Sequence, residues 1–129
     1  ALSPKVRETV KARITALVAG VAEGFGATGR VAFGGGYPVT ENHPAEAAFM
    51  AEVAASLVGE EGVDRDPAPM MVAEDFSYML AARPGAYIFM GNGDSAGLHH
   101  PEYDFCDAAA PYGAALWAGL VEAALPIRP

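Results

Sequence analysis

The sequence predicts an α/β fold, because segments with helical periodicity alternate with short apolar runs along most of the chain. Two observations support this prediction most directly. The run over residues 86–90 is continuously apolar, which is typical of a strand covered on both faces of a sheet. Glycine-rich and polar residues follow this run at once, as expected for a functional loop at the carboxyl end of a strand.

The first helix is predicted to begin after Ser3 and Pro4, since serine is a favoured N-cap and proline is tolerated at the first helical position. Its apolar residues recur at helical spacing and would form one buried face: Val6, Val10, Ile14, Leu17 and Val21. A short strand is expected over residues 30–33. The three glycines at 34–36 lack the lysine and hydroxyl residue of a phosphate-binding loop. We therefore interpret them as a mobile hinge between the two parts of the chain.

The remaining elements expected are helices over residues 44–58, over 76–82 and from Pro111, with strands over 70–72 and 86–90. Their alternation is what predicts the α/β packing. One helix and one strand before the hinge are too few to close a core, so that part predicts half of another domain.

Composition excludes several classes of partner. The net charge of −8 and the isoelectric point near 4.7 argue against nucleic acid and anionic membranes as partners. No uninterrupted apolar run approaches the roughly 20 residues that span a bilayer. Cys106 is the single cysteine, which excludes an intrachain disulfide and favours a reducing, cytoplasmic location. A mean hydropathy of +0.19 indicates self-association or packing against additional sequence.

The segment Gly-Leu-His-His-Pro-Glu-Tyr-Asp-Phe at 97–105 carries the densest group of functional side chains. His99 follows the predicted strand over 86–90, so it is a candidate metal ligand; the alternative is a loop histidine hydrogen-bonded to a carboxylate. His100 points the opposite way in an extended chain and is the weaker candidate. A catalytic zinc-like site needs about three protein ligands. With one good ligand, this chain is not expected to complete such a site alone.

Several motifs appear in an order that resembles the C-terminal third of the aminoacylase-like metallo-amidohydrolases, the group of hippurate hydrolases, N-acyl-amino-acid amidohydrolases and auxin-conjugate hydrolases. The motifs are Gly-Tyr-Pro-Val-Thr-Glu-Asn-His-Pro at 36–44, Glu-Asp-Phe-Ser-Tyr-Met at 74–79, Arg-Pro-Gly-Ala-Tyr at 83–87 and Leu-His-His-Pro-Glu-Tyr-Asp-Phe at 98–105.

The resemblance implies a two-domain metallopeptidase-like architecture. A catalytic α/β domain binds two divalent ions, and an inserted α+β lid of ferredoxin-like form mediates dimerisation. Residues 1–38 would correspond to the second half of the lid, and residues 39–129 to the C-terminal part of the catalytic domain. The expected ions are zinc, manganese, cobalt or nickel, which imidazole and carboxylate ligands do not distinguish.

The resemblance also implies residue roles. His99 matches the family's metal-binding histidine in the Leu-His-x-Pro motif, and Asn42 would help to hold the substrate carboxylate. Asp104 is a candidate to fix the tautomer of His99 by a hydrogen bond. In the family the other ligands and the general-base glutamate lie upstream, so no catalytic residue is assigned here. Cys106 stands where the family usually has asparagine and is expected to be a small buried thiol.

The activity implied is metal-dependent hydrolysis of the amide bond of small N-acyl amino acids by a homodimer. This chain would be a portion of the enzyme that is inactive without the missing N-terminal region. Two alternatives remain open: a non-catalytic dimerisation or interaction module that retains the fold, and a protein that binds one metal ion.

Overall fold

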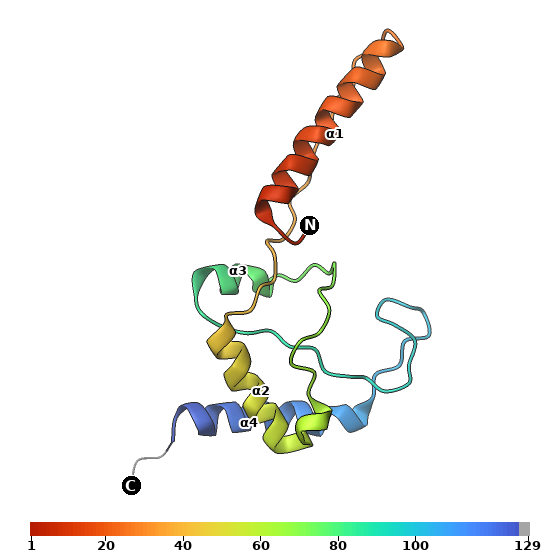
Figure 1. The fold of residues 1–129 in the computed structure, drawn as a ribbon. Helices are drawn as coiled ribbons and strands as arrows, with labels where there is room; N and C mark the ends of the chain where they lie inside the picture. The colour runs from red at the N-terminus through yellow and green to blue at the C-terminus, as the bar shows by residue number, and fades with distance from the viewer. Residues whose placement is uncertain (127–129) are drawn as a thin grey trace. The chain divides into compact units, whose positions relative to one another are not determined.

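The computed structural model describes residues 1–126 as helices joined by extended segments and loops (Figure 1). The elements are α1 (Pro4–Gly24), α2 (Pro44–Val58), η1 (Glu60–Gly62), α3 (Phe76–Ala82), η2 (Asp107–Ala109) and α4 (Ala110–Ala124), where η denotes a 3-10 turn. None of the helices among these residues combines the length and hydropathy of a bilayer-spanning segment.

Backbone contacts divide the chain into two units. The first comprises Ala1–Glu41 and Ala68–Pro84, and the second comprises Asn42–Pro67 and Gly85–Pro129. The domain boundary expected after Pro38 stays a prediction. The expected second domain covers residues 39–129, of which 127–129 lie outside the described residues.

The α/β prediction is wrong, because the described residues contain helices and no β-strand. The segments 30–33, 70–72 and 86–90 carry no strand assignment, and no ladder of backbone hydrogen bonds joins them to one another. An apolar pattern favours an extended backbone, but a strand exists only when a second backbone pairs with it. The prediction that residues 1–38 form half of a ferredoxin-like lid is wrong for the same reason, because the described part of the chain has no β-strand for α1 to cover.

The helix boundaries were predicted well. α1 begins after Ser3, which has an extended backbone, and α2 begins after His43 and ends at Gly59, where φ is 82°. α3 covers the expected residues 76–82, and the last helix begins at Ala110, one residue before the expected Pro111. Proline in the first turn of α1, α2 and α4 and glycine after α2 are local signals that agree with these ends, while no N-cap side chain of these helices makes a capping hydrogen bond.

In the first unit, the chain after α1 runs back beside that helix (Figure 1). The N–H of Ala27 donates to the carbonyl oxygen of Ala22 at 2.9 Å, and Lys11 Nζ lies 6.0 Å from the centre of the Phe33 ring. The connector that follows is held at three successive carbonyl groups. Arg7 donates to those of Gly35 and Tyr37, each at 3.2 Å, and Tyr78 of α3 donates to that of Gly36 at 2.9 Å.

These contacts constrain the predicted hinge. Gly36 has φ of 133°, in the region that favours glycine, and a Cβ there would lie 2.6 Å from Arg7 Nη2. The rings of Tyr37 and Tyr78 also meet edge to face, with centroids 6.0 Å apart. The glycine run is therefore fixed to its own unit by side chains from two helices.

Replacing Gly36 with alanine is expected to destabilise the chain by about 1–3 kcal/mol, because the backbone becomes strained and Arg7 must release its carbonyl partners. Gly34→Ala is the matched control, since a Cβ at Gly34 meets nothing within 4 Å. This control is expected to be neutral or slightly stabilising. Thermal unfolding followed by circular dichroism measures both variants, and equal midpoints would contradict the constraint at Gly36.

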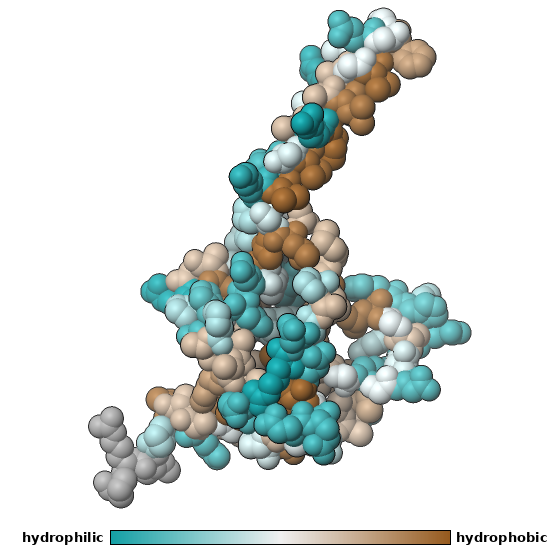
Figure 2. Space-filling view, viewed as in Figure 1, coloured by the Kyte–Doolittle hydropathy of each residue, from teal (hydrophilic) through white to brown (hydrophobic). Residues whose placement is uncertain are grey.

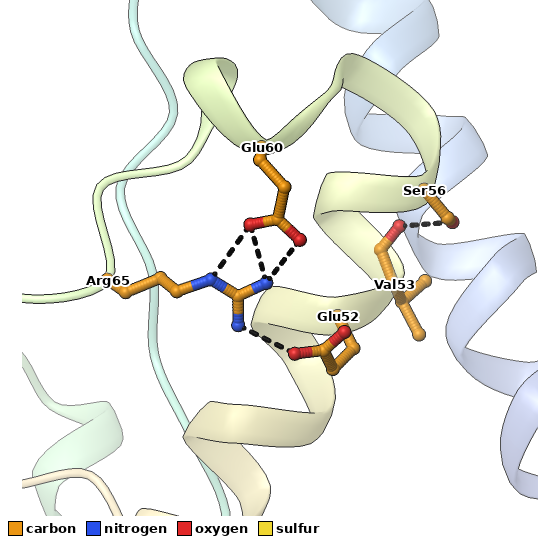
Figure 3. A network of polar contacts seen from close by, with 5 residues as sticks. All are labelled: Glu52, Val53, Ser56, Glu60 and Arg65. Atoms are coloured by element: carbon orange, nitrogen blue, oxygen red, sulfur yellow. Dashed lines mark hydrogen bonds and ion pairs between the residues drawn. The ribbon is translucent and has the colours of Figure 1, made fainter.

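In the second unit, α2 packs against α4 (Figure 1). The approach is close, because a Cβ at Gly119 of α4 would lie 3.1 Å from Val53 Cγ1 of α2. The turn after α2 is tied back to that helix by Arg65, which donates to Glu60 and to Glu52, both at 2.9 Å (Figure 3). Hydrogen bonding to Glu60 is the largest cause that raises the pKa of the Arg65 guanidinium above its usual value.

Few apolar side chains of the described residues are buried. Leu80, Ala86 and Leu120 are less than a tenth exposed, and the apolar face expected on the first helix is open to solvent (Figure 2). The total accessible surface is 10223 Å², whereas a compact monomer of this mass exposes about 6,500 Å² and two separate halves about 7,800 Å². The expected buried faces of the helices are therefore largely uncovered in this chain.

Candidate functional site

The histidine loop, defined here as residues 92–106, lies in the second unit between the extended segment 85–91 and η2 (Figure 1, light blue). Turn hydrogen bonds shape its tip. The N–H of His100 donates to the carbonyl of Gly97 at 3.1 Å, and the N–H of Tyr103 donates to that of His100 at 3.0 Å. The tip is thus a pair of successive tight turns, and His99 is the third residue of the first turn.

His99 is exposed and has φ of 68°, and it is the one non-glycine residue with positive φ in the part of the chain described. This left-handed conformation costs an L-residue about 1 kcal/mol relative to the ordinary regions. Its ring accepts or donates no hydrogen bond within residues 1–126. The structure therefore presents an imidazole to solvent from a strained position, as functional residues often are.

The ring of His100, in contrast, serves the loop itself. Its Nδ1 accepts the N–H of Glu102 at 3.1 Å, which closes a local turn. The two neighbouring histidines therefore differ in their contacts: the His99 ring has no partner among the described residues, and the His100 ring is bonded to the backbone of its own loop. The prediction that His99 is the metal ligand stays a prediction.

Asp104 is held through its backbone. Its carbonyl accepts from Asn92 Nδ2 at 2.6 Å and from Ser95 Oγ at 2.9 Å, and its N–H donates to Ser95 Oγ at 3.1 Å. No hydrogen bond joins its carboxylate to His99 among the described residues. The predicted role of Asp104 in fixing the His99 tautomer stays a prediction.

Asn42 mimics a strand partner for the segment 85–91. Its Oδ1 accepts the N–H of Tyr87 at 2.7 Å, and its Nδ2 donates to the carbonyl of Tyr87 at 2.8 Å. Next to it, the N–H of His43 donates to the carbonyl of Gly85 at 3.1 Å, and His43 Nδ1 accepts the N–H of Gly85 at 3.2 Å. One N–H of the Asn42 amide remains for a further acceptor, because a carboxamide nitrogen carries two.

The described residues alone do not fit a metal ion. Within residues 1–126, no three His, Cys, Asp or Glu side chains lie close enough together to hold one. Cys106 is partly buried rather than fully buried as expected, and its N–H donates to Asn92 Oδ1 at 2.8 Å. His99 is thus chemically suited to be one ligand of a site whose other ligands come from outside these residues.

Asn92 and Ser95 were missed by the sequence analysis. Both hold the ends of the histidine loop together, yet the sequence suggested only a glycine-rich turn around them. A usable signal was present, because asparagine and serine in turns commonly hydrogen-bond to nearby backbone groups.

Comparison with known proteins gives the class of hydrolase, since relatives of this chain are named amidohydrolase, hippurate hydrolase and N-acetyldiaminopimelate deacetylase. The chain belongs to peptidase family M20/M25/M40, whose model matches residues 4–123. This match confirms the resemblance to the aminoacylase-like amidohydrolases. No solved structure matches the chain significantly.

The similarity to this chain covers only part of the length of each relative. YhaA of Bacillus subtilis, whose name assigns it provisionally to the amidohydrolases, is 32% identical over 88% of this chain and 30% of that protein. Hippurate hydrolase of Campylobacter jejuni is 34% identical over 64% of the chain and 22% of its own length. N-acetyldiaminopimelate deacetylase of Lactococcus lactis is 36% identical over 76% and 26%. The chain therefore spans less than a third of the length of these curated relatives.

Proposed function

We propose that the chain is the C-terminal portion of a metal-dependent amidohydrolase that cleaves N-acyl amino acids into a carboxylic acid and a free amino acid. The observation that carries the proposal is His99, which is exposed at φ of 68° in the loop with the Leu-His-x-Pro motif, inside the region that the family model matches. The names of the relatives support the substrate class, since hippurate and N-acetyldiaminopimelate are both N-acyl amino acids.

Three residues of this chain have a role in the proposed site. His99 supplies one imidazole to a divalent ion, and Asn42 uses its remaining amide N–H to hold the substrate carboxylate. Asp104 orients the His99 ring once the site is complete. When bound, such an ion polarises a carbonyl oxygen and lowers the pKa of water. The general base and the other ligands belong to the missing N-terminal region.

The cofactor proposed is a pair of divalent ions, chosen among zinc, manganese, cobalt and nickel. Imidazole with carboxylate ligands suits all four, so the choice depends on the remaining ligands. A cytoplasmic location belongs to the same proposal and rests on the single thiol of Cys106.

The test compares this chain with the longer polypeptide that contains it. The 129-residue chain is expected to release no amino acid from N-benzoylglycine or N-acetyldiaminopimelate. The longer polypeptide with added zinc or manganese is expected to release the free amino acid and the carboxylic acid. Free amine detection measures the reaction, and a chelator is the control that removes the ions. Hydrolysis by the short chain, or none by the longer one with any of the four metals, would contradict the proposal.

A dimerisation module is the second candidate, and the exposed face of α1 favours it. This face carries five branched apolar side chains along one side of the helix, each at least 40% exposed: Val6, Val10, Ile14, Leu17 and Val21 (Figure 2). Contiguous apolar surface of this kind marks protein interfaces. Sedimentation of the chain distinguishes a dimer from a monomer, and a dimer of the full polypeptide is compatible with both candidates.

A further inference from the structure

The histidine loop is closed at its base by side chains instead of a β-ladder. The carboxamide of Asn92 takes the N–H of Cys106 at 2.8 Å on its Oδ1 and gives a hydrogen bond to the carbonyl of Asp104 at 2.6 Å from its Nδ2. Ser95 Oγ accepts the N–H of Asp104 at 3.1 Å, and its proton reaches the carbonyl of Asp104 at 2.9 Å or that of Ala96 at 3.2 Å. We call these four residues, 92, 95, 104 and 106, the loop neck.

The loop neck satisfies the backbone on the returning side of the loop. Both polar backbone groups of Asp104 and the N–H of Cys106 pair with only two side chains. The bond to the Cys106 N–H is part-buried, so leaving that group without a partner would be costly. The bonds to Asp104 are exposed and compete with water, so each adds less. Together the bonds favour one closed arrangement of the two ends. The neck does for the loop what pairing of two strands does for a hairpin.

His99 lies between these fixed ends. Three residues separate it from Ser95, and four separate it from Asp104. The turns at Gly97 and His100 fill most of this length, so closure of the neck limits the positions that His99 can take. Without the neck, ordering the loop around an ion would cost conformational entropy at the moment of binding.

We propose that Asn92 and Ser95 are positioning residues that hold the histidine loop in the conformation that presents His99 to its ion. The inference rests on the proposed metal-binding role of His99. Neither residue would touch the ion, since their polar atoms are used by the backbone of Asp104 and Cys106. Loss of either neck side chain is expected to weaken binding by about 10–100-fold, the size found for groups that orient metal ligands.

The first measurement is amide hydrogen exchange in the 129-residue chain by NMR. Asn92→Ala is expected to speed exchange at Cys106, and Ser95→Ala to speed it at Asp104. Asn92→Asp keeps the acceptor for Cys106 and should preserve protection there, and Ser95→Thr keeps the hydroxyl. Ser56→Ala is the matched control, because the Ser56 hydroxyl donates to the Val53 carbonyl within α2. Unchanged exchange in both alanine variants would overturn the neck.

The second measurement is zinc affinity of the longer polypeptide, by competition with a chelator. Asn92→Ala and Ser95→Ala should weaken binding by about 10–100-fold, with Ser95→Thr restoring it, and His99→Ala should weaken it further. If His99→Ala binds less zinc while both alanine variants bind normally, the positioning role is refuted and the proposed function stands. If His99→Ala itself binds zinc normally, the proposed ligand is wrong, and the positioning role fails with it.

Discussion

Replacing His99 with glycine is expected to abolish amide hydrolysis by the complete enzyme while leaving its stability unchanged or slightly raised. The two effects separate because the imidazole and the backbone at this position make opposite demands. The side chain supplies a metal ligand in the proposed function, and its loss should lower kcat/KM by at least about 100-fold. The backbone has φ of 68°, which glycine adopts without the cost of about 1 kcal/mol that an L-residue carries.

His99→Asn and His100→Ala complete this experiment. Asparagine tolerates the left-handed region and removes the imidazole, so His99→Asn should share the loss of activity. His100→Ala removes a ring that accepts the N–H of Glu102, so its expected effect is on loop order rather than on binding of an ion. Steady-state kinetics and thermal unfolding are measured on all three. Wild-type activity in His99→Gly would refute the ligand role.

Replacing Leu120 with alanine is expected to be the most destabilising single truncation in the second unit. Leu120 is the buried apolar side chain among the described residues of α4, at 9% exposure. Leucine-to-alanine changes in cores cost about 2–5 kcal/mol through lost burial and the cavity left behind. Among residues 1–126, Leu120 is one of three apolar residues that are less than a tenth exposed, so its truncation removes a large share of the buried apolar surface.

Trp117→Ala is the control on the same helix. Trp117 is larger than Leu120 but 67% exposed, so its removal should change the free energy of unfolding by no more than about 0.5 kcal/mol. It should also reduce binding of a hydrophobic dye, which reports exposed apolar surface. Urea unfolding followed by circular dichroism gives the two free energies. A larger loss in Trp117→Ala than in Leu120→Ala would show that α4 packs differently in solution.

Helix ends were predictable from sequence because their signals are local. Pro4 and Pro44 lie in the first turns of their helices, Gly59 follows the last residue of α2, and Glu74 accepts the N–H of Phe76 at 3.2 Å. The predicted strands were wrong, because a strand needs a second segment to pair with, and the apolar pattern does not identify such a segment. Residues such as Ile88 and Phe89 have the composition of a buried strand, yet they are 41% and 55% exposed.

The candidate site divides in the same way. His99 was a candidate from the sequence because this chain has three histidines, two of them adjacent in a recognisable motif. Asn92 and Ser95 were not, since their partners at Asp104 and Cys106 are 9 to 14 residues away and depend on how the loop closes. The full set of ligands was beyond prediction for a plainer reason: no such group occurs among the described residues.

Asn92 precedes Gly93, and asparagine followed by glycine is the pair that most readily loses its side-chain nitrogen as ammonia. The reaction passes through a cyclic imide, which water opens to aspartate and, in larger part, to isoaspartate, in which the side-chain carbonyl carbon joins the backbone. The aspartate product still accepts from Cys106 but no longer donates to Asp104. Ageing of the protein at neutral pH would therefore remove the hydrogen bond from residue 92 to the carbonyl of Asp104 and place a negative charge in the loop neck. In a stored sample, the molecules that carry aspartate should behave as the Asn92→Asp variant, and those that carry isoaspartate should lose more of the loop neck. Mass spectrometry can follow the rate of conversion.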